Sequence, residues 1–419
     1  MLSISLGGVS AALFALALLH TFATGLFNQL ARRFPRHAGV LHLLGEVEVV
    51  FGFWALVLVG VMAAFQGRAA AVTYLEQQNF TEPLFVFVVM VIAATRPILR
   101  LAGAVVAAVA RLIPGRGAVG FYFCSLLILP LLGSLITEAA AMTVAALMLR
   151  DRLYAAGIST RLQYATLGVL FVNVSIGGLL TSFAAPPVLM VASAWGWDSP
   201  FMFANFGWRA ALAVTANALL ATLAFRRELA ALPLPQSLAH PARMPWGVTV
   251  VHLGFLAAVV GFGHHPVVFI GLLLFFLGFA QAYERHQDRL VLREGLLVAF
   301  FLAGLVVLGG QQRGWLEPLL TSLGAGSVFY GATVLTAVTD NAALTYLGSL
   351  VPGLTPEFKL ALVAGAVTGG GLTVIANAPN PAAFAILRGQ FTAGSISPWR
   401  LLLAALPPTL VAIAAFRLF

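Results

Sequence analysis

The sequence predicts an all-α polytopic membrane protein built from two inverted repeats. Each repeat is expected to hold five transmembrane helices plus one re-entrant hairpin, with broken helices at the midplane of the membrane. Three observations lead to this fold class: the composition is very apolar, the apolar runs are long and continuous, and the second half copies motifs of the first. Of the 419 residues, 61% are hydrophobic and 9% are charged, which excludes an ordinary soluble domain.

The apolar runs define the expected elements, because several approach or exceed the ~20 residues that an α-helix needs to cross the hydrocarbon core. A membrane β-barrel would instead alternate in polarity over segments of about 10 residues. In the first repeat, residues 1–225, we expect spans near 4–27, 38–66, 80–110, 162–194 and 207–225, with a hairpin at about 118–150. In the second repeat, residues 246–419, we expect spans near 246–262, 266–282, 294–310, 360–387 and 397–417, with a hairpin at about 316–352. Residues 226–245 contain four prolines and predict a cytoplasmic linker.

The distribution of positive charge predicts the orientation, since Lys and Arg collect in short cytoplasmic loops. With both termini outside, 18 of the 23 Lys and Arg residues fall on the inside and 5 on the outside. The net charge of +9 is therefore explained by membrane orientation, and it gives no support to a nucleic-acid partner. An odd number of spans in each half makes the halves inverted.

Two short motifs each place a carboxylate in apolar sequence. Residues 136–140 read ITEAA and contain Glu138, while residues 338–343 read VTDNAA and contain Asp340. A carboxylate within membrane-spanning sequence is costly and by default indicates a functional site. We expect the two motifs to form the tips of the two hairpins and to meet in mid-membrane.

A Gly-Gly-x-x-Thr pattern follows each acidic motif and predicts a break in the fourth span of each repeat. The pattern occurs at 177–181 and 369–373, with a proline six residues beyond each threonine. Broken helices expose amides at one end and carbonyls at the other, which are resources for ion binding. Hydroxyl and amide side chains accompany the breaks: Asn173, Ser175, Thr181 and Ser182 in the first, and Thr368, Thr373, Asn377 and Asn380 in the second. The alternative role of such residues is hydrogen bonding between packed helices.

The segment from Asn173 to Ala192 is similar to the first broken helix of the ion transporter superfamily, which includes dicarboxylate/sodium symporters, arsenite pumps and D-type sodium/proton antiporters. The pair Asp340-Asn341 looks like the aspartate-asparagine pair of the D-type antiporters. From about residue 40 to the end, the chain resembles a bacterial family of sodium/proton antiporters. Dicarboxylate symporters carry Ser-Asn-Thr at both tips, whereas two acids stand here, which disfavours a dianionic substrate.

The resemblance implies a carrier of the elevator type, a homodimer, and a location in the bacterial inner membrane. The residues predicted to bind the cation or the proton share polar side chains at the tips and breaks: Glu138, Asp340, Asn341, Thr137, Thr339, Asn173, Ser175, Thr181, Thr373, Asn377 and Asn380. Burial favours the protonated carboxyl and a bound cation favours the ionised one, so proton and sodium compete for one site. Sodium and protons are the expected substrates, with no cofactor, no nucleotide and no transition metal.

Two other function classes stay open. One is a cation-coupled symporter or efflux carrier for a small anion or metabolite. The other is a membrane-embedded enzyme, although the sequence has no His-Glu-x-x-His, Gly-x-Ser-x-Gly or phosphate-loop motif.

A candidate proton path lies early in the second span and consists of His42, Glu46 and Glu48. Because Glu46 follows His42 by four residues, the two are expected to share one helix face. The alternative is a structural ion pair or hydrogen bond near the cytoplasmic interface.

Overall fold

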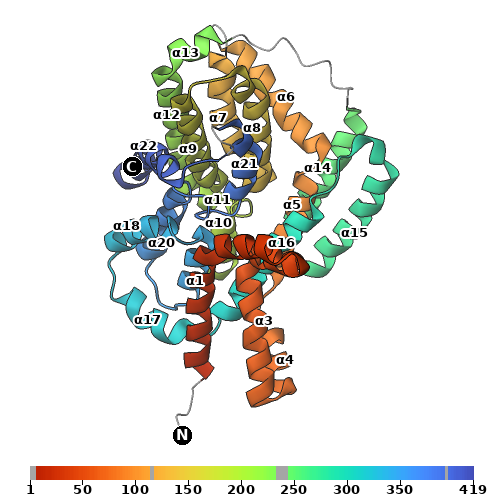
Figure 1. Ribbon diagram of the computed structural model, residues 1–419, viewed down its shortest axis with the longest axis vertical. Helices are drawn as coiled ribbons and strands as arrows, with labels where there is room; N and C mark the ends of the chain where they lie inside the picture. Colours follow the sequence, from red (N-terminus) through yellow and green to blue (C-terminus); the bar gives the residue numbers. More distant parts are fainter. Residues whose placement is uncertain (1–5, 114–117, 233–243, 392–394) are drawn as a thin grey trace.

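The computed structural model describes residues 6–113, 118–232, 244–391 and 395–419, and every regular element within these ranges is a helix (Figure 1). Seven helices in the described ranges are long and apolar enough to cross a membrane, or eight if one bent pair counts as a single span. The prediction of an all-α polytopic membrane protein is therefore confirmed. The inversion of the halves and the re-entrant hairpins stay predictions.

The first half contains thirteen α-helices in its described residues. They are α1 (Leu6–Arg33), α2 (Ala38–Leu44), α3 (Val47–Gln66), α4 (Arg68–Glu76), α5 (Thr81–Ala93), α6 (Arg96–Leu112), α7 (Val119–Ile136), α8 (Glu138–Arg152), α9 (Thr160–Gly177), α10 (Pro186–Trp195), α11 (Ser199–Met202), α12 (Trp208–Ala224) and α13 (Arg226–Ala231). A five-residue π-helical turn joins α11 to α12.

Two of the predicted spans in this half are not single continuous helices. The predicted span 38–66 is divided between α2 and α3, because Glu46 takes an extended conformation before α3. The predicted span 80–110 bends by 67° between α5 and α6. Pro97 stands in the first turn of α6, and its missing N–H cannot continue the hydrogen-bond ladder of α5.

The second half contains nine α-helices in its described residues. They are α14 (Trp246–Gly261), α15 (Pro266–Ala282), α16 (Leu292–Gly309), α17 (Arg313–Thr321), α18 (Ala325–Thr336), α19 (Asn341–Ser349), α20 (Pro356–Gly369), α21 (Asn380–Leu387) and α22 (Pro398–Leu418). The region predicted as a hairpin at 316–352 forms three helices, and α18 packs far more extensively on α20 than on α19. Of the predicted linker, α13 occupies the start, and residues 233–243 lie outside the described ranges.

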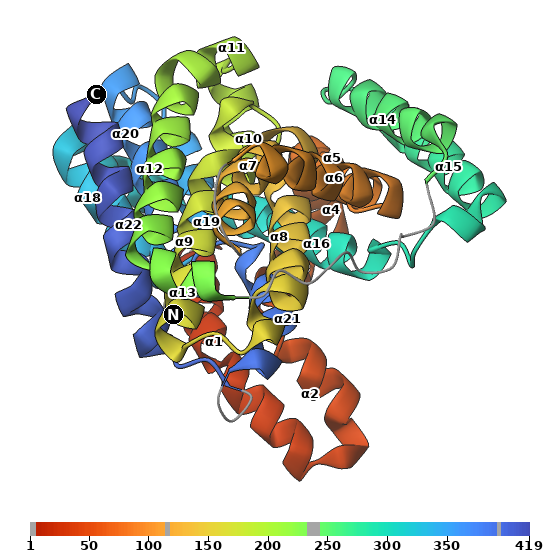
Figure 2. The same ribbon diagram turned by 90° about the horizontal axis from the view of Figure 1, so that it is seen from above.

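The helices form two groups by their packing, and both views show α14 and α15 of one group on the side opposite α18, α20 and α22 of the other (Figures 1 and 2). We call the first the frame group: α1, α3, α5, α14, α15 and α16. In it, α16 packs on α3 and α5, and α14 and α15 pack on α5. We call the second the core group: α7, α8, α9, α10, α12, α18, α19, α20, α21 and α22. Its central helix, α9, packs against α7, α12, α20 and α22.

Both expected breaks are present as non-helical segments inside the core group. In the first half, α9 ends at Gly177, a 3-10 turn follows, and α10 begins only at Pro186. In the second half, α20 ends at Gly369 and α21 begins at Asn380. The halves also exchange partners, because α10 packs on α19 and α21 packs on α8. Each broken helix thus meets the tip helix of the other half.

Candidate functional site

The two tip helices begin at different residues of their motifs. In the first half, Thr137 is the N-cap residue and Glu138 is the first residue of α8. In the second half, Asp340 is the N-cap residue and Asn341 is the first residue of α19. The similarity of the two motifs suggests that the two acids occupy matching places, but Asp340 lies one position earlier relative to its helix than Glu138 does. The side chains at matching positions in the two halves are Glu138 and Asn341.

Backbone contacts at equal sequence offsets support this correspondence. The amide of Glu138 donates to the carbonyl of Ala184, at 3.4 Å, and the amide of Asn341 donates to that of Ala376, at 3.1 Å. Ala184 follows Thr181 by three residues, as Ala376 follows Thr373. In both halves, the first helical residue of the tip is thus anchored to the unwound segment of the same half.

Glycines at matching places give the two tip side chains their space. A Cβ on Gly178 would lie 2.6 Å from Glu138 Oε1, and a Cβ on Gly370 would lie 2.8 Å from Asn341 Nδ2. Gly178 and Gly370 each precede the threonine of the Gly-Gly-x-x-Thr pattern in their break by three residues. The Gly-Gly-x-x-Thr pattern therefore serves close packing of the break against the tip as well as the break itself.

Glu138 and Asn341 are both buried, at 1% and 0% exposed. Asn377 Nδ2 donates to Glu138 Oε2 at 2.9 Å, whereas Glu138 Oε1 has no hydrogen-bond partner. Neither atom of the Asn341 amide group has a partner. Leaving a buried polar atom unpaired costs roughly 1–3 kcal/mol, so these atoms indicate a binding role more than a packing role.

Two further amides, Asn377 and Asn380, come from the second unwound segment. Asn380 Nδ2 donates to the carbonyls of Gly370 and Thr373, both at 2.8 Å. The Oδ1 atoms of Asn377 and Asn380 are buried and have no donor. Asn380 thus holds the break and Asn377 holds Glu138 through their N–H groups, and each keeps an oxygen acceptor unused.

The threonines of both breaks bind the unwound segments to the end of the helix that comes before each tip, α7 in the first half and α18 in the second. Thr181 Oγ donates to the carbonyl of Ser134 at 2.6 Å, and Thr373 Oγ donates to that of Ala337 at 2.8 Å. Ser134 was missed from the sequence, although its hydroxyl donates to the Gly177 carbonyl and accepts from the Leu180 amide. A lone serine in an apolar helix gives no signal that marks it for this task.

Three of the predicted site residues make hydrogen bonds that hold the backbone together. Asn173 Nδ2 donates to the carbonyls of Leu126 and Val214, and its Oδ1 accepts from Asn217, which the sequence reasoning missed. Ser175 donates to the Val367 carbonyl at 2.7 Å. Thr339 donates to the Leu335 carbonyl of its own helix end. The bonds of Asn173 and Ser175 join packed helices, as in the alternative raised from the sequence, and that of Thr339 stays within its own helix end. Their predicted role in cation binding stays a prediction.

Asp340 caps its helix. Its Oδ1 accepts from the amides of Ala342 and Ala343, at 2.8 and 3.2 Å, as expected for an N-cap aspartate. Unlike Glu138, the Asp340 side chain is only partly buried. Thr137 has the same capping place and accepts from the Ala140 amide at 3.4 Å.

A cavity of about 310 Å³, which we call the central cavity, lies between the frame group and the core group. The core group contributes Thr137 and Glu138 from the tip, with parts of α10 and α21. The frame group contributes the polar side chains Glu46, Glu48, Arg293 and Glu294, with apolar residues of α5 and α16. The buried carboxylate of Glu138 is thus reached from a cavity that itself carries acidic groups.

Glu48 lines a cavity at each of the two tips. It lines the central cavity with Glu138, and it also lines a small cavity of about 20 Å³ together with Asp340 and Asn377. Asn377 in turn donates to Glu138. The structure therefore brings Glu138, Asp340 and Glu48 around one amide, even though Glu48 comes from the frame group.

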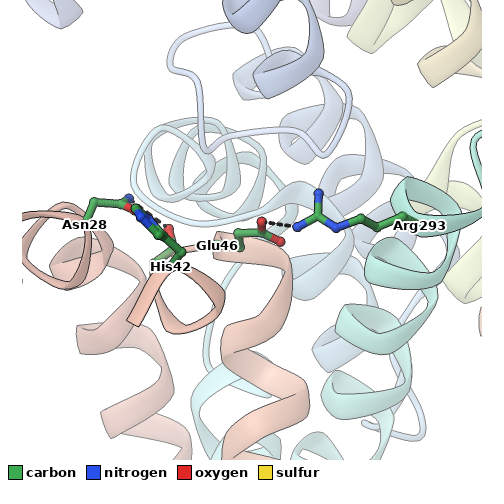
Figure 3. Close-up of polar contacts among 5 residues, drawn as sticks. Asn28, His42, Glu46 and Arg293 are labelled. Carbon is green, nitrogen blue, oxygen red and sulfur yellow. Dashed lines mark hydrogen bonds and ion pairs between the residues drawn. The ribbon is translucent and has the colours of Figure 1, made fainter. Parts of the chain in front are cut away.

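The other two residues of the candidate proton path do not share a helix face, so that expectation is wrong. The helix break at Gly45 and Glu46 separates His42, in α2, from Glu46, which caps α3. His42 bonds to Asn28 Oδ1 at 3.1 Å, whereas Glu46 forms an ion pair with Arg293 of α16 (Figure 3). Glu46 thus has the structural role that was the alternative.

A second cavity, which we call the distal cavity, has a volume of about 330 Å³ and lies at the other end of α5. It is lined by Thr81 and Glu82 at the start of α5, whereas Ala94, just after α5, lines the central cavity. Phe183 and Leu189 line both cavities. The two cavities therefore approach the unwound segment of the first half from opposite sides.

Among the described residues, no group of three or more His, Cys, Asp or Glu side chains is arranged to hold a metal ion. The acids of the site instead combine with amides and unwound backbone. A protein family described as "Putative Na+/H+ antiporter" matches residues 5–419. The chain belongs to this family. No curated protein matches it. Membership of the family confirms the resemblance seen in the sequence, and it identifies a membrane protein of an antiporter family with sodium and protons as the implied ions.

Proposed function

We propose that the chain exchanges sodium, or another small cation, for protons at the Glu138–Asn341 pair. One observation carries this proposal: four buried oxygens in this cluster have no hydrogen-bond donor. They are Glu138 Oε1 and the Oδ1 atoms of Asn341, Asn377 and Asn380. Small hard cations bind through carboxylate and carbonyl oxygens. A cation among these oxygens would satisfy the unpaired acceptors, whereas a proton would neutralise the Glu138 carboxylate, so the two are alternatives at one carboxylate.

The acidity of the central cavity favours a cation over an anion as the substrate. Glu46, Glu48 and Glu294 line the approach to Glu138, and Arg293 is paired with Glu46. A small anion entering this cavity would meet several carboxylates before reaching the tips. A cation would be attracted, because clefts lined by one sign of charge concentrate ions of the opposite sign.

The movement that we propose is of the elevator type, with the core group shifting against the frame group. Both tips and both breaks belong to the core group, and the central and distal cavities lie along its border with the frame group. A shift along this border would transfer Glu138 from the reach of one cavity to the reach of the other. From the arginine distribution we infer that the central cavity faces the cytoplasmic side of the inner membrane, with both termini outside.

The test is sodium-dependent proton movement in proteoliposomes that hold the purified protein. Glu138→Gln removes the carboxylate and keeps the side-chain size, so we expect exchange to be abolished while the protein stays folded. Asp340→Asn keeps an oxygen for the helix cap and removes the charge, so we expect loss of exchange with an unchanged Tm. Glu76→Gln, on an exposed position of α4, is the matched control and should retain exchange.

Two results would contradict the proposal. One is wild-type protein that moves no protons in response to sodium or lithium. The other is a Glu138→Gln variant that exchanges as fast as Glu76→Gln. Stimulation of transport by an organic acid or an oxyanion would favour the symporter alternative instead.

A further inference from the structure

A groove on the side of the core group has no part in the proposed exchange. It runs between α9, α12 and α22, which pack side by side (Figures 1 and 2). We call it the lateral groove. Its volume is about 630 Å³, and its walls are mostly apolar, with Val169, Leu220, Leu403 and Val411 among them. Leu220 and Leu403 are about half exposed, at 54% and 48%, so the groove opens onto the surface of a membrane protein.

One end of the lateral groove is basic. Arg161, at the start of α9, and Arg400, at the start of α22, both line it. Each guanidinium group lies over an aromatic ring of the same groove: Arg161 Cζ is 5.7 Å from the centroid of Phe225, and Arg400 Cζ is 5.9 Å from that of Tyr164. Contact with the ring face orients a guanidinium group. The two positive groups are therefore placed at one end of an apolar groove.

A second, more polar pocket of about 410 Å³ continues the groove beyond Arg161 and adds Arg227. Its one acid, Glu228, already accepts from the amide and the hydroxyl of Ser159, at 2.7 and 2.9 Å. Within the described ranges, no carboxylate lies at ion-pair distance from Arg161, Arg227 or Arg400. Three arginines against the one glutamate leave this end with a net positive charge.

The length of the groove matches one leaflet of a bilayer. On α22 it extends from Arg400 to Val411, which is about 16 Å at the helical rise of 1.5 Å per residue. The hydrocarbon core is about 30 Å thick, so the apolar part reaches about half-way across. An acyl chain of one leaflet is therefore long enough to fill this apolar part.

We propose that the lateral groove binds one anionic glycerophospholipid, with an acyl chain along α9, α12 and α22 and its phosphate group on Arg161 and Arg400. Guanidinium groups bind phosphate oxygens in a bidentate manner. Anionic lipids are abundant in the cytoplasmic leaflet, and Arg161, Arg227 and Arg400 all belong to loops that the charge distribution places on the cytoplasmic side. The lipid would lie on the core group, away from the Glu138 site.

The test measures thermal unfolding of the purified protein in a neutral detergent. Phosphatidylglycerol and phosphatidylcholine with identical acyl chains are added in parallel, and inorganic phosphate is added alone as a third arm. We expect phosphatidylglycerol to raise Tm by several degrees, and phosphatidylcholine and phosphate to raise it much less. The double variant Arg161→Gln/Arg400→Gln should lose this difference. The variant Arg32→Gln/Arg33→Gln removes the same charge from the exposed end of α1 and should keep it.

A steric variant tests the groove separately from its charge. Ala224 is exposed and lines both the groove and the basic pocket, so Ala224→Trp should fill the passage between them and weaken the effect of phosphatidylglycerol. Equal stabilisation by both lipids, or an undiminished difference in the double arginine variant, would overturn the proposal. Conversion of a dimer to a monomer by Ala224→Trp would also overturn it, because the groove would then be an interface between two copies. None of these readouts depends on ion exchange.

Discussion

Thr137 combines backbone strain with a place next to the buried carboxylate. Its φ of 79° and ψ of 149° lie in a region that glycine populates and other residues rarely do. It is the only non-glycine residue with positive φ in the described ranges. The strain is sustained because α7 must end at Ile136 and α8 must begin at Glu138, with both helices fixed in the core group.

We predict that Thr137→Gly makes the protein more stable. Relief of the strain gains about 1–3 kcal/mol, while a threonine-to-glycine change at an N-cap costs only a few tenths of a kcal/mol. Added chain entropy in the unfolded state costs a further 0.5–1 kcal/mol or so, which leaves a net gain of about 1 kcal/mol. The measurement is Tm in detergent. We also expect slower exchange, because a flexible glycine at position 137 no longer fixes the direction in which the Glu138 side chain points.

Thr339→Gly is the control for this prediction, since Thr339 is the threonine of the other acidic motif and lies one residue before the N-cap Asp340. Thr339 has a negative φ, so glycine brings no relief there and Tm should fall. If both variants lower Tm by similar amounts, Thr137 is not strained in the way its dihedral angles indicate.

At the scale of the helix, the frame group depends on one close crossing between α3 and α16. A Cβ on Gly304 would overlap the backbone of Gly52, and a Cβ on Gly52 would overlap the ring of Phe300. Glycine lets two membrane helices approach to backbone contact, which is how dispersion forces hold them together without a hydrophobic driving force. The Glu46–Arg293 ion pair joins the same two helices at one end.

We predict that Gly304→Ala lowers the free energy of unfolding by about 1–3 kcal/mol, the usual cost of overpacking, because the obstructing atoms are backbone and cannot turn aside. The control is Gly271→Ala in α15, where an added Cβ meets nothing within 4 Å and alanine is the better helix former. Thermal unfolding in detergent should show a lower Tm for the first variant and an equal or higher Tm for the second. Equal values for the two would mean that α3 and α16 do not cross at these glycines.

Much of this helical organisation was predictable, because apolar runs and Gly-Gly-x-x-Thr patterns act locally. Both non-helical segments begin within the glycine clusters at 177–178 and 369–371, since glycine weakens a helix wherever it occurs. The polar residues beside the breaks were also found from sequence, and Asn377 and Asn380 proved to be buried in the site. What they contact depended on packing between halves, which a sequence pattern does not encode.

The register of the tips was not predictable. Threonine and aspartate are both good N-cap residues, so the motifs Thr137-Glu138 and Thr339-Asp340 each allow two starting points for the tip helix. Packing against Ala184 and Ala376 selects different starts in the two halves. The spacing of His42 and Glu46 led to a wrong prediction of a shared helix face. The i, i+4 rule assumes a continuous helix, and the extended backbone at Glu46 interrupts the helix there.

At the scale of the whole molecule, the border between the frame and core groups holds two cavities that do not merge. Along α5, the lining of the distal cavity runs from Thr81 to Phe85 and that of the central cavity from Val86 to Ala94, so the two cavities adjoin there. Phe183 and Leu189 are the side chains common to both. Under the proposed exchange, protons must not cross this border freely, and we infer that these two apolar side chains are the barrier between the cavities.

We predict that Phe183→Ala makes the protein leak protons without sodium. Phe183 belongs to the unwound segment between α9 and α10, so its removal joins the central and distal cavities while leaving the helices intact. The measurement is the decay of an imposed pH gradient in sodium-free proteoliposomes, which should be several-fold faster than with wild-type protein. Phe65→Ala, at a position 85% exposed, is the matched control and should stay tight. If the pH gradient decays no faster with Phe183→Ala than with Phe65→Ala, the barrier to protons lies elsewhere along the border.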